Sequence, residues 1–168
     1  LAKLKDYVSL GGKILSTGKS GDVATNNFEL GVKCLGESNF NPTYLNPTYN
    51  GTGLTPSNYV IYSKAYNTEL LDNDAKILAY VKEPYFNRGK FKYCSHRHTP
   101  FNLNDGMIAI SIGKDGGYIA FDIFTEYATH GCYSAKEAVI KTIDAILGQD
   151  KTLSTKLPSV GVVSFNEQ

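Results

Sequence analysis

Residues 84–100, PYFNRGKFKYCSHRHTP, gather side chains that could take part in chemistry. They include Cys94, His96 and His98 among aromatic and cationic residues, and they contain no carboxylate. On a β-strand, this spacing would place the thiol and both imidazoles on one face, a geometry that metals can use. A metal site needs about three or four protein ligands, and nothing else at a matching offset completes this one. We therefore favour a buried or interface polar cluster and expect no metal.

A thiol beside an imidazole is a second kind of chemistry that these residue types allow. Cys94 or Cys132 could pair with His96, His98 or His130, because imidazole favours formation of the nucleophilic thiolate. Neither cysteine lies in a strand-turn-helix elbow such as G-x-C-x-G, where the turn exposes the nucleophile. We expect no catalytic residue in this chain and keep a small hydrolase with a Cys–His pair as the alternative.

Phosphate binding and glycosidic chemistry have weaker signals. The turn STGKSG (16–21) follows an apolar run, but the glycines before that run lie on the wrong side for a G-x-x-x-x-G-K-[ST] loop. Paired carboxylates for glycoside hydrolysis would come from separate strand ends, and Glu83, Asp122 and Glu126 are available. Ordinary surface or helix-capping roles are favoured for all three. We expect no cofactor.

Composition bounds the class of protein. The 168 residues are 42% hydrophobic and 20% charged, which is typical of a folded globular domain. No apolar run approaches the roughly 18 residues of a membrane span. Seventeen basic and 16 acidic residues give a formal net charge of +1, so no overall field would gather nucleic acid or an anionic membrane. We expect neither as a partner.

The cysteines bear on the cellular compartment. Cys34, Cys94 and Cys132 are odd in number, widely spaced and free of any C-x-x-C pair. This pattern suits reduced thiols better than a disulfide framework or a zinc site. A reducing setting follows, which favours the cytoplasm, although the sequence does not assign the localisation.

The sequence also predicts the helices and strands that would position these residues. A helix is predicted over residues 1–10 and ends at a double glycine, and a short buried strand is predicted over 13–17. Residues 36–58, rich in Pro, Asn, Thr and Gly, predict a long surface loop. Strands are predicted over 58–63, 76–81 and 159–165. The run 107–123 predicts a hairpin that turns at 114–117, and 134–148 predict a helix capped by Ser134.

Strands that alternate with helices early, followed by a hairpin and a long terminal helix, indicate a single α/β domain over residues 1–168. We predict a three-layer α/β/α mixed sheet. Because the chain starts at Leu1 directly on a helical pattern, we expect a fragment of a larger chain that lacks one or two N-terminal strands.

Four stretches carry a family resemblance: LKDYVSLGGKILSTGKSG (4–21), VKEPYFNRGKFKYCSHRHTP (81–100), GGYIAFDIFTEYATHGCYSAKEAVIKTIDAIL (116–147) and LPSVGVVSFNEQ (157–168). Together they resemble the beta-galactosidase trimerisation domain, the middle domain of family-42-like glycoside hydrolases. The resemblance implies a class I glutamine amidotransferase-like, flavodoxin-like fold. Amidotransferase relatives use a Cys-His-Glu triad with the cysteine on an elbow, whereas the matching turn here has Gly18-Lys19-Ser20-Gly21 and no cysteine.

The resemblance also implies a role. In such enzymes this domain follows a catalytic (β/α)₈ barrel that carries both catalytic carboxylates, and it precedes a small β domain. We therefore expect a non-catalytic domain that supports oligomerisation and lines a carbohydrate site. Its expected partners are the barrel of its own chain, further copies of itself and carbohydrate. The candidate carbohydrate or interface contacts are Arg88, His96, Arg97, His98 and Tyr127.

Overall fold

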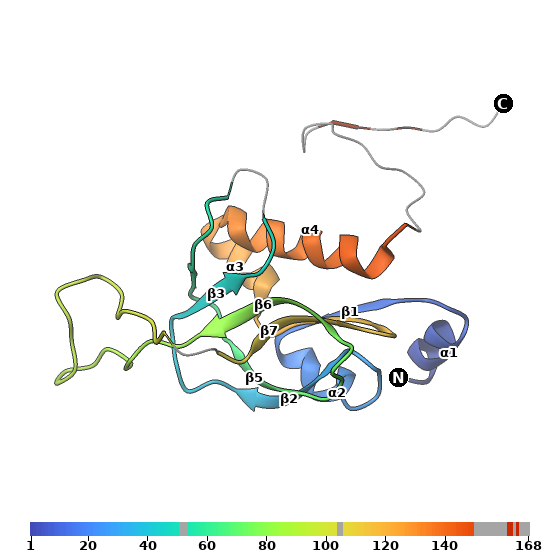
Figure 1. Cartoon of the computed structure of the whole chain (residues 1–168), viewed down its shortest axis with the longest axis horizontal. Coiled ribbons are helices and arrows are strands. Elements are labelled where there is room, and N and C mark those ends of the chain that lie inside the picture. The colour runs from blue at the N-terminus through green and yellow to red at the C-terminus, as the bar shows by residue number, and fades with distance from the viewer. Residues whose placement is uncertain (51–53, 104–105, 150–160, 163, 165–168) are drawn as a thin grey trace.

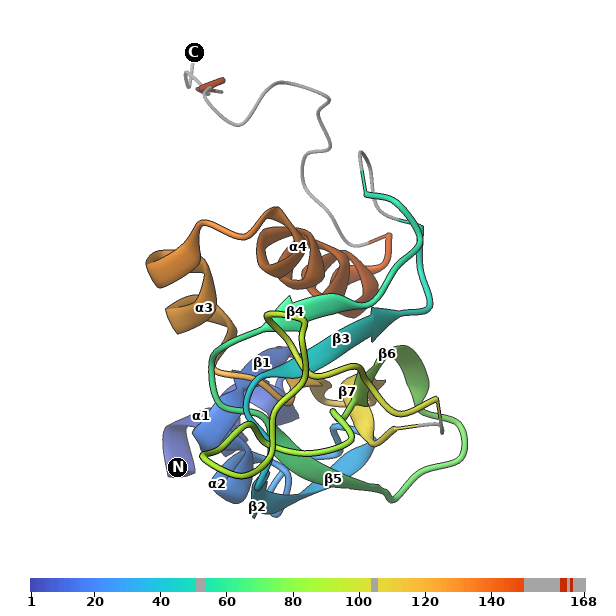
Figure 2. The same ribbon diagram turned by 90° about the vertical axis from the view of Figure 1, so that its left-hand side faces the viewer.

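A six-stranded mixed sheet forms the centre of the computed structural model, which describes residues 1–50, 54–103, 106–149, 161–162 and 164. Across the sheet the order is β1 (Ile14–Thr17), β8 (Gly116–Ile119), β7 (Ile108–Gly113), β6 (Lys76–Lys82), β3 (Thr43–Pro47) and β4 (Tyr59–Ile61). Strands β1 and β8 run parallel, and the other neighbouring pairs run antiparallel. The sheet curls into a half-barrel (Figure 2).

The two faces of the sheet are covered differently (Figure 1). Helices α3 (Ile123–His130) and α4 (Tyr133–Leu147) lie over one face and close the larger apolar cluster. The other face carries the short helix α2 (Gly21–Ala24) and a two-stranded antiparallel sheet of β2 (Val32–Glu37) and β5 (Tyr66–Leu70). Helix α1 (Ala2–Ser9) buries none of its residues. None of the helices in the described ranges is long and apolar enough to cross a membrane.

The predicted three-layer, flavodoxin-like α/β/α fold is wrong, because the structure is mostly β with few helices. A flavodoxin-like sheet needs parallel strands joined by crossover helices. Here the helix–glycine–strand unit at the N-terminus occurs once, and the strands from β2 to β8 follow one another without an intervening helix. Antiparallel neighbours need no crossover helix, so the middle of the chain builds the sheet from hairpins and loops.

Most of the individually predicted elements are confirmed. The two predicted helices are α1 and α4, the strands predicted over 13–17, 58–63 and 76–81 are β1, β4 and β6, and the hairpin is β7–β8. Cys132, rather than Ser134, takes the N-cap position of α4, and no side chain caps that end. The strand predicted over 159–165 lies outside the described residues, apart from positions 161, 162 and 164.

The segment 36–58 differs from the predicted surface loop, since part of it enters the sheet. Strand β3 lies between β6 and β4, and Thr43, Tyr44 and Leu45 are buried. The proline-rich composition hides this strand, because Pro42 precedes it and Pro47 is its last residue. Proline is tolerated at such strand ends, so the three residues after Pro42 can still pair.

We predict that Phe121→Ala lowers the free energy of unfolding by about 3–5 kcal/mol, because it opens a cavity in a closed core. Phe121 is fully buried in the larger apolar cluster. The matched control is Phe124→Ala, whose ring three residues away is 57% exposed, and it should change stability by less than about 1 kcal/mol. Urea denaturation followed by circular dichroism measures both changes, and similar losses for the two variants would contradict this packing.

Candidate functional site: an aromatic and cationic arm

A long projection leaves the sheet between two antiparallel neighbours, and we call residues 84–103 the arm. Strands β6 and β7 pair directly, yet the chain between them runs from residue 83 to residue 107. A hairpin connection normally takes two to five residues. Figure 1 shows the arm in yellow-green at the left, standing well clear of the sheet and helices. The connection is therefore much longer than a β-hairpin needs.

The base of the arm is held in place by hydrogen bonds. The Tyr85 N–H donates to the Pro100 carbonyl at 3.0 Å, and Pro84 and Phe101 form a β-bridge. The Tyr44 hydroxyl of β3 donates to the carbonyl of Thr99. Burial, with smaller effects of Cys94 and Tyr62, raises the pKa of Tyr44, so its hydroxyl stays protonated and remains a donor. The arm is therefore a structured extension of the sheet.

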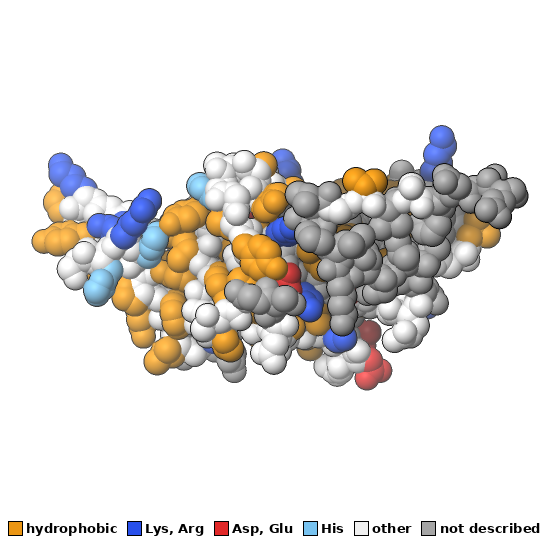
Figure 3. Space-filling model, turned by 90° about the horizontal axis from the view of Figure 1, so that it is seen from above, with side chains coloured by type: hydrophobic (Ala, Val, Ile, Leu, Met, Phe, Trp, Pro, Cys, Tyr) orange, Lys and Arg blue, Asp and Glu red, His pale blue; other side chains and the backbone are white. Residues whose placement is uncertain are grey.

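The outer part of the arm exposes large apolar side chains. Phe91 is 87% exposed and Tyr93 is 77% exposed, and at the base of the arm Tyr85 and Leu103 are exposed as well. The Lys90 ammonium lies 5.5 Å from the centre of the Phe91 ring. The left end of Figure 3 shows hydrophobic, Lys or Arg, and His side chains side by side. Exposed aromatic groups mixed with arginine are typical of an interaction surface.

Three of the predicted site residues come together in the arm, although through backbone groups. The Arg88 Nη1 donates to the carbonyl oxygens of His96, at 3.0 Å, and of Arg97. This contact folds the outer loop of the arm onto itself. Arg88 therefore supports the arm, whereas the side chains of His96 and Arg97 are exposed to the surroundings.

The fourth predicted residue, His98, faces the body of the protein. Its Nε2 lies 2.7 Å from the hydroxyl of Tyr62, the residue directly after β4. The Tyr62 ring also packs against His130, the last residue of α3, with ring centroids 4.9 Å apart. One tyrosine thus joins the arm to the end of α3. Sequence reasoning missed Tyr62, because nothing in its local pattern distinguishes it from a strand residue.

A buried carboxylate fixes the position of Tyr62. Glu126 of α3 is only 1% exposed, and its Oε2 accepts the backbone N–H groups of Tyr62 at 2.9 Å and Ser63 at 2.6 Å. Its neighbour Tyr127, the fifth predicted residue, is half-exposed on the surface of α3. Glu126 is therefore a buried structural acceptor for the turn after β4, which is neither the surface role nor the helix-capping role that the sequence favoured. The contacts described here do not join Tyr127 to the arm.

The metal and nucleophile hypotheses both depended on local geometry. The segment around His96 and His98 is not a strand, so the argument that placed three ligands on one face does not apply. The Cys94 thiol instead donates to the carbonyl oxygens of His96 at 3.4 Å and His98 at 3.6 Å. Within the described ranges, no group of three or more His, Cys, Asp or Glu side chains could hold a metal ion.

The other two thiols donate hydrogen bonds to carboxylates, and not to imidazoles. Cys132 donates to Glu126 Oε1 at 3.6 Å, and Cys34 donates to Asp22 Oδ1 at 3.3 Å. Burial is the largest cause that raises the pKa of both thiols. A raised pKa leaves less thiolate at neutral pH, which is the opposite of nucleophile activation. Cys34 and Cys132 are thus poor candidates for covalent catalysis, and the arm offers donors and aromatic faces for binding.

Comparisons with known proteins add a relative of known activity. No protein-family model matches the chain, and the curated proteins give no match. Among solved structures, alpha-L-fucosidase isoenzyme 2 from Paenibacillus thiaminolyticus matches with a TM-score of 0.82 and 34% sequence identity. The match covers 94% of this chain and 24% of the fucosidase chain. This chain therefore spans about a quarter of the length of that protein.

The expected relation to glycoside hydrolases is confirmed at a coarse level, since an alpha-L-fucosidase is a glycoside hydrolase. Nearly the whole of this chain has the fold of one part of that enzyme. The finer expectation, a beta-galactosidase trimerisation domain, stays a prediction from the resemblance, and its flavodoxin-like fold is the part that the structure overturns.

We predict that Cys34 and Cys132 react with iodoacetamide at neutral pH more slowly in the folded chain than in urea, because burial raises both pKa values. Labelling at short times followed by peptide mass spectrometry gives the rate for each site. The same peptides from urea-unfolded protein are the matched control. Faster labelling of Cys132 in the folded state would reveal an activated thiol and support the Cys–His hydrolase, and faster labelling of Cys34 would contradict the effect of burial.

Proposed function

We propose that this chain is a non-catalytic domain of a glycoside hydrolase, and that its arm supports oligomerisation and lines a carbohydrate site. The observation that carries the proposal is the arm, a structured 84–103 projection with exposed aromatic rings and cations. The similarity to part of an alpha-L-fucosidase supports the class of the whole enzyme. The catalytic carboxylates would lie in the part of such an enzyme that this chain does not span.

The chemistry of the arm favours a protein surface as its partner. Residues 84–103 contain Arg88, Lys90, Lys92 and Arg97 and no carboxylate. An acidic surface would supply the missing counter-charges, while Phe91 and Tyr93 would be buried at the contact. Aromatic residues and arginine dominate the energetics of protein interfaces. We propose a second copy of this chain and a catalytic barrel domain as the two surfaces that the arm touches.

Carbohydrate contact follows from the same side chains. The imidazole of His96 and the guanidinium of Arg97 are exposed donors at the outer loop. Flat aromatic faces beside such donors suit a sugar ring, whose apolar C–H groups and hydroxyls alternate around the ring. Tyr127 offers a further aromatic group on α3, one turn from His130. The hydrogen bonds of the cysteines count against the alternative Cys–His hydrolase.

The 168-residue chain is predicted to give no turnover of nitrophenyl fucosides, galactosides or arabinosides, because the reaction needs a pair of carboxylates that this domain is proposed to lack. Release of nitrophenol over hours is the measurement, and a buffer blank sets the background. Hydrolysis that disappears on changing one carboxylate of this chain would reject the non-catalytic assignment.

Self-association through the arm gives the second test. The wild-type chain should sediment as a dimer or larger species at high protein concentration, and Phe91→Ser with Tyr93→Ser should return it to a monomer by removing buried aromatic area. Leu35→Ser with Leu71→Ser is the matched control, because both leucines are exposed and lie outside the arm. A chain that stays monomeric, or a control pair with the same effect, would contradict an interface on the arm.

A further inference from the structure

A second polar region lies apart from the arm, at the carboxyl ends of the parallel strands β1 and β8. It is a pocket of about 340 Å³, within the size range of small-molecule sites, and we call it the strand-end pocket. Its lining residues are Lys19, Asp22, Glu37, Lys64, Tyr66 and Asp122. In α/β structures the carboxyl ends of parallel neighbours are a common place for ligands, because loops from two strands open there side by side.

The turn after β1 is built to admit a carboxylate. Gly18 has φ +53°, and a Cβ on it would lie 1.9 Å from the Asp122 Oδ1. Any other residue would be strained and would displace the Asp122 side chain from the turn. Ser20 closes the same turn, since its Oγ donates to the Thr17 carbonyl at 2.7 Å and accepts the Thr17 N–H at 3.1 Å. The absence of a side chain at Gly18 therefore leaves room for the Asp122 carboxylate at the rim of the pocket.

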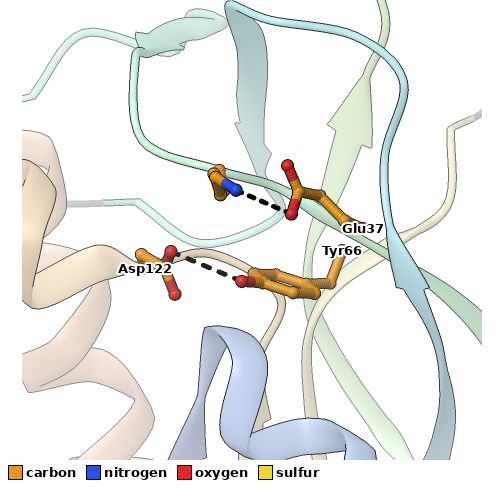
Figure 4. A network of polar contacts seen from close by, with 4 residues as sticks. Glu37, Tyr66 and Asp122 are labelled. Carbon is orange, nitrogen blue, oxygen red and sulfur yellow. Dashed lines mark hydrogen bonds and ion pairs between the residues drawn. The ribbon is translucent and has the colours of Figure 1, made fainter.

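Tyr66 and the pair of Lys64 and Glu37 form one wall (Figure 4). The Tyr66 hydroxyl donates to Asp122 Oδ2 at 3.4 Å, and the Lys64 ammonium pairs with Glu37 at 2.8 Å. Burial and then the charge of Asp122 raise the pKa of Tyr66 to about 12. The phenol is thus protonated at neutral pH and stays a donor. The bond to Asp122 is long, so this carboxylate keeps acceptor capacity for another partner.

Buried side chains next to the pocket form hydrogen bonds to Asp22 and to the turn after β1. The thiol of Cys34 donates to Asp22 Oδ1, and the Tyr118 hydroxyl donates to the Gly18 carbonyl at 2.8 Å. A thiol is a weak donor, so Asp22 also retains acceptor capacity. Tyr118 is buried beneath the turn, and a Cβ on Gly21 would lie 2.4 Å from its hydroxyl. These contacts place the turn against the buried Tyr118, while Asp22 itself is exposed to the surroundings.

The charges select a class of ligand. Three carboxylates and two ammonium groups line the pocket, which leaves an excess of one negative charge. With Lys64 paired to Glu37, the remaining groups are the carboxylates of Asp22 and Asp122 and the Lys19 ammonium. Ring hydroxyls are donors that can serve two carboxylates at once and can also accept from an ammonium group. An anionic ligand would be repelled by the excess charge.

We propose that the strand-end pocket binds a hydroxyl-rich ligand of monosaccharide size, whose ring hydroxyls donate to the carboxylates of Asp22 and Asp122. None of the pocket residues belongs to the arm, so this site is separate from the contacts assigned to the arm above. The proposal does not require the chain to belong to a glycoside hydrolase, and either can fail without the other.

Three sugars that share one ring configuration and differ in charge give the test: galactose, galactosamine and galacturonate. Titration of the ¹⁵N-labelled chain, followed by ¹H–¹⁵N NMR spectra, measures affinity and location together. Galactose and galactosamine should shift the amide signals of residues 18–22, 64–66 and 122. Galacturonate should bind at least about tenfold more weakly than galactose. No shift at millimolar sugar, shifts confined to the arm, or tighter binding of galacturonate would each overturn the proposal.

The matched variants are Asp122→Asn and Glu69→Gln. Asp122→Asn keeps the shape of the side chain and should weaken galactose binding about tenfold or more, as expected for a hydrogen bond to a charged group. Glu69→Gln removes an exposed carboxylate from the same strand as Tyr66 but outside the pocket, and should leave the affinity unchanged. If Asp122→Asn disturbs the fold in its NMR spectrum, Asp22→Asn replaces it. Unchanged affinity in the folded variant would disprove the role of these carboxylates.

Discussion

The buried carboxylate of Glu126 supports the chain segment that contacts both the arm and the strand-end pocket. A buried negative charge is costly unless it receives hydrogen bonds, and Glu126 receives two from consecutive backbone N–H groups after β4. That turn carries Tyr62, which contacts the arm through His98, and Lys64, which lines the strand-end pocket. Helix α3 thereby fixes the connection on which both regions depend. The carboxylate also accepts from the thiol of Cys132, directly before α4.

The sheet itself separates the two regions. Strand β8 pairs in parallel with β1 and antiparallel with β7. Because β1 and β8 run in the same direction, the turn after β1 lies at the same end of the sheet as Asp122, which follows β8. The arm instead grows from the connection of β6 and β7 and leaves the sheet on its own. The turn beside the pocket is therefore closely packed around Gly18 and Gly21, whereas the arm is held by backbone hydrogen bonds at its base and by side-chain contacts to Tyr44 and Tyr62. A concave surface suits a small ligand, and a projecting surface suits a macromolecular partner.

The sequence singled out the composition of residues 84–100 but predicted a buried or interface polar cluster there, and not a projecting arm. The excess of positive charge and the aromatic residues of 84–100 are visible in the sequence. The structure places them on a projecting surface. Strand-like runs and the terminal helix were also predictable, because their apolar periodicity is local. Strand β3 was missed between two prolines, and α3 was missed because FDIFTEYATH combines aromatic and β-branched residues with only one turn of clear helical spacing.

The sequence by itself determined the elements with clear local periodicity, such as α1, α4 and the β7–β8 hairpin, where the cations gather, and that residues 84–103 have no internal counter-charge. Those properties depend on neighbours along the chain. Only the tertiary structure decided that the sheet is mainly antiparallel, that Tyr62 meets His98, and that Asp22, Tyr66 and Asp122 line one pocket. These residues are separated by many positions in the chain, and their meeting depends on strand order and register, which local pattern does not specify.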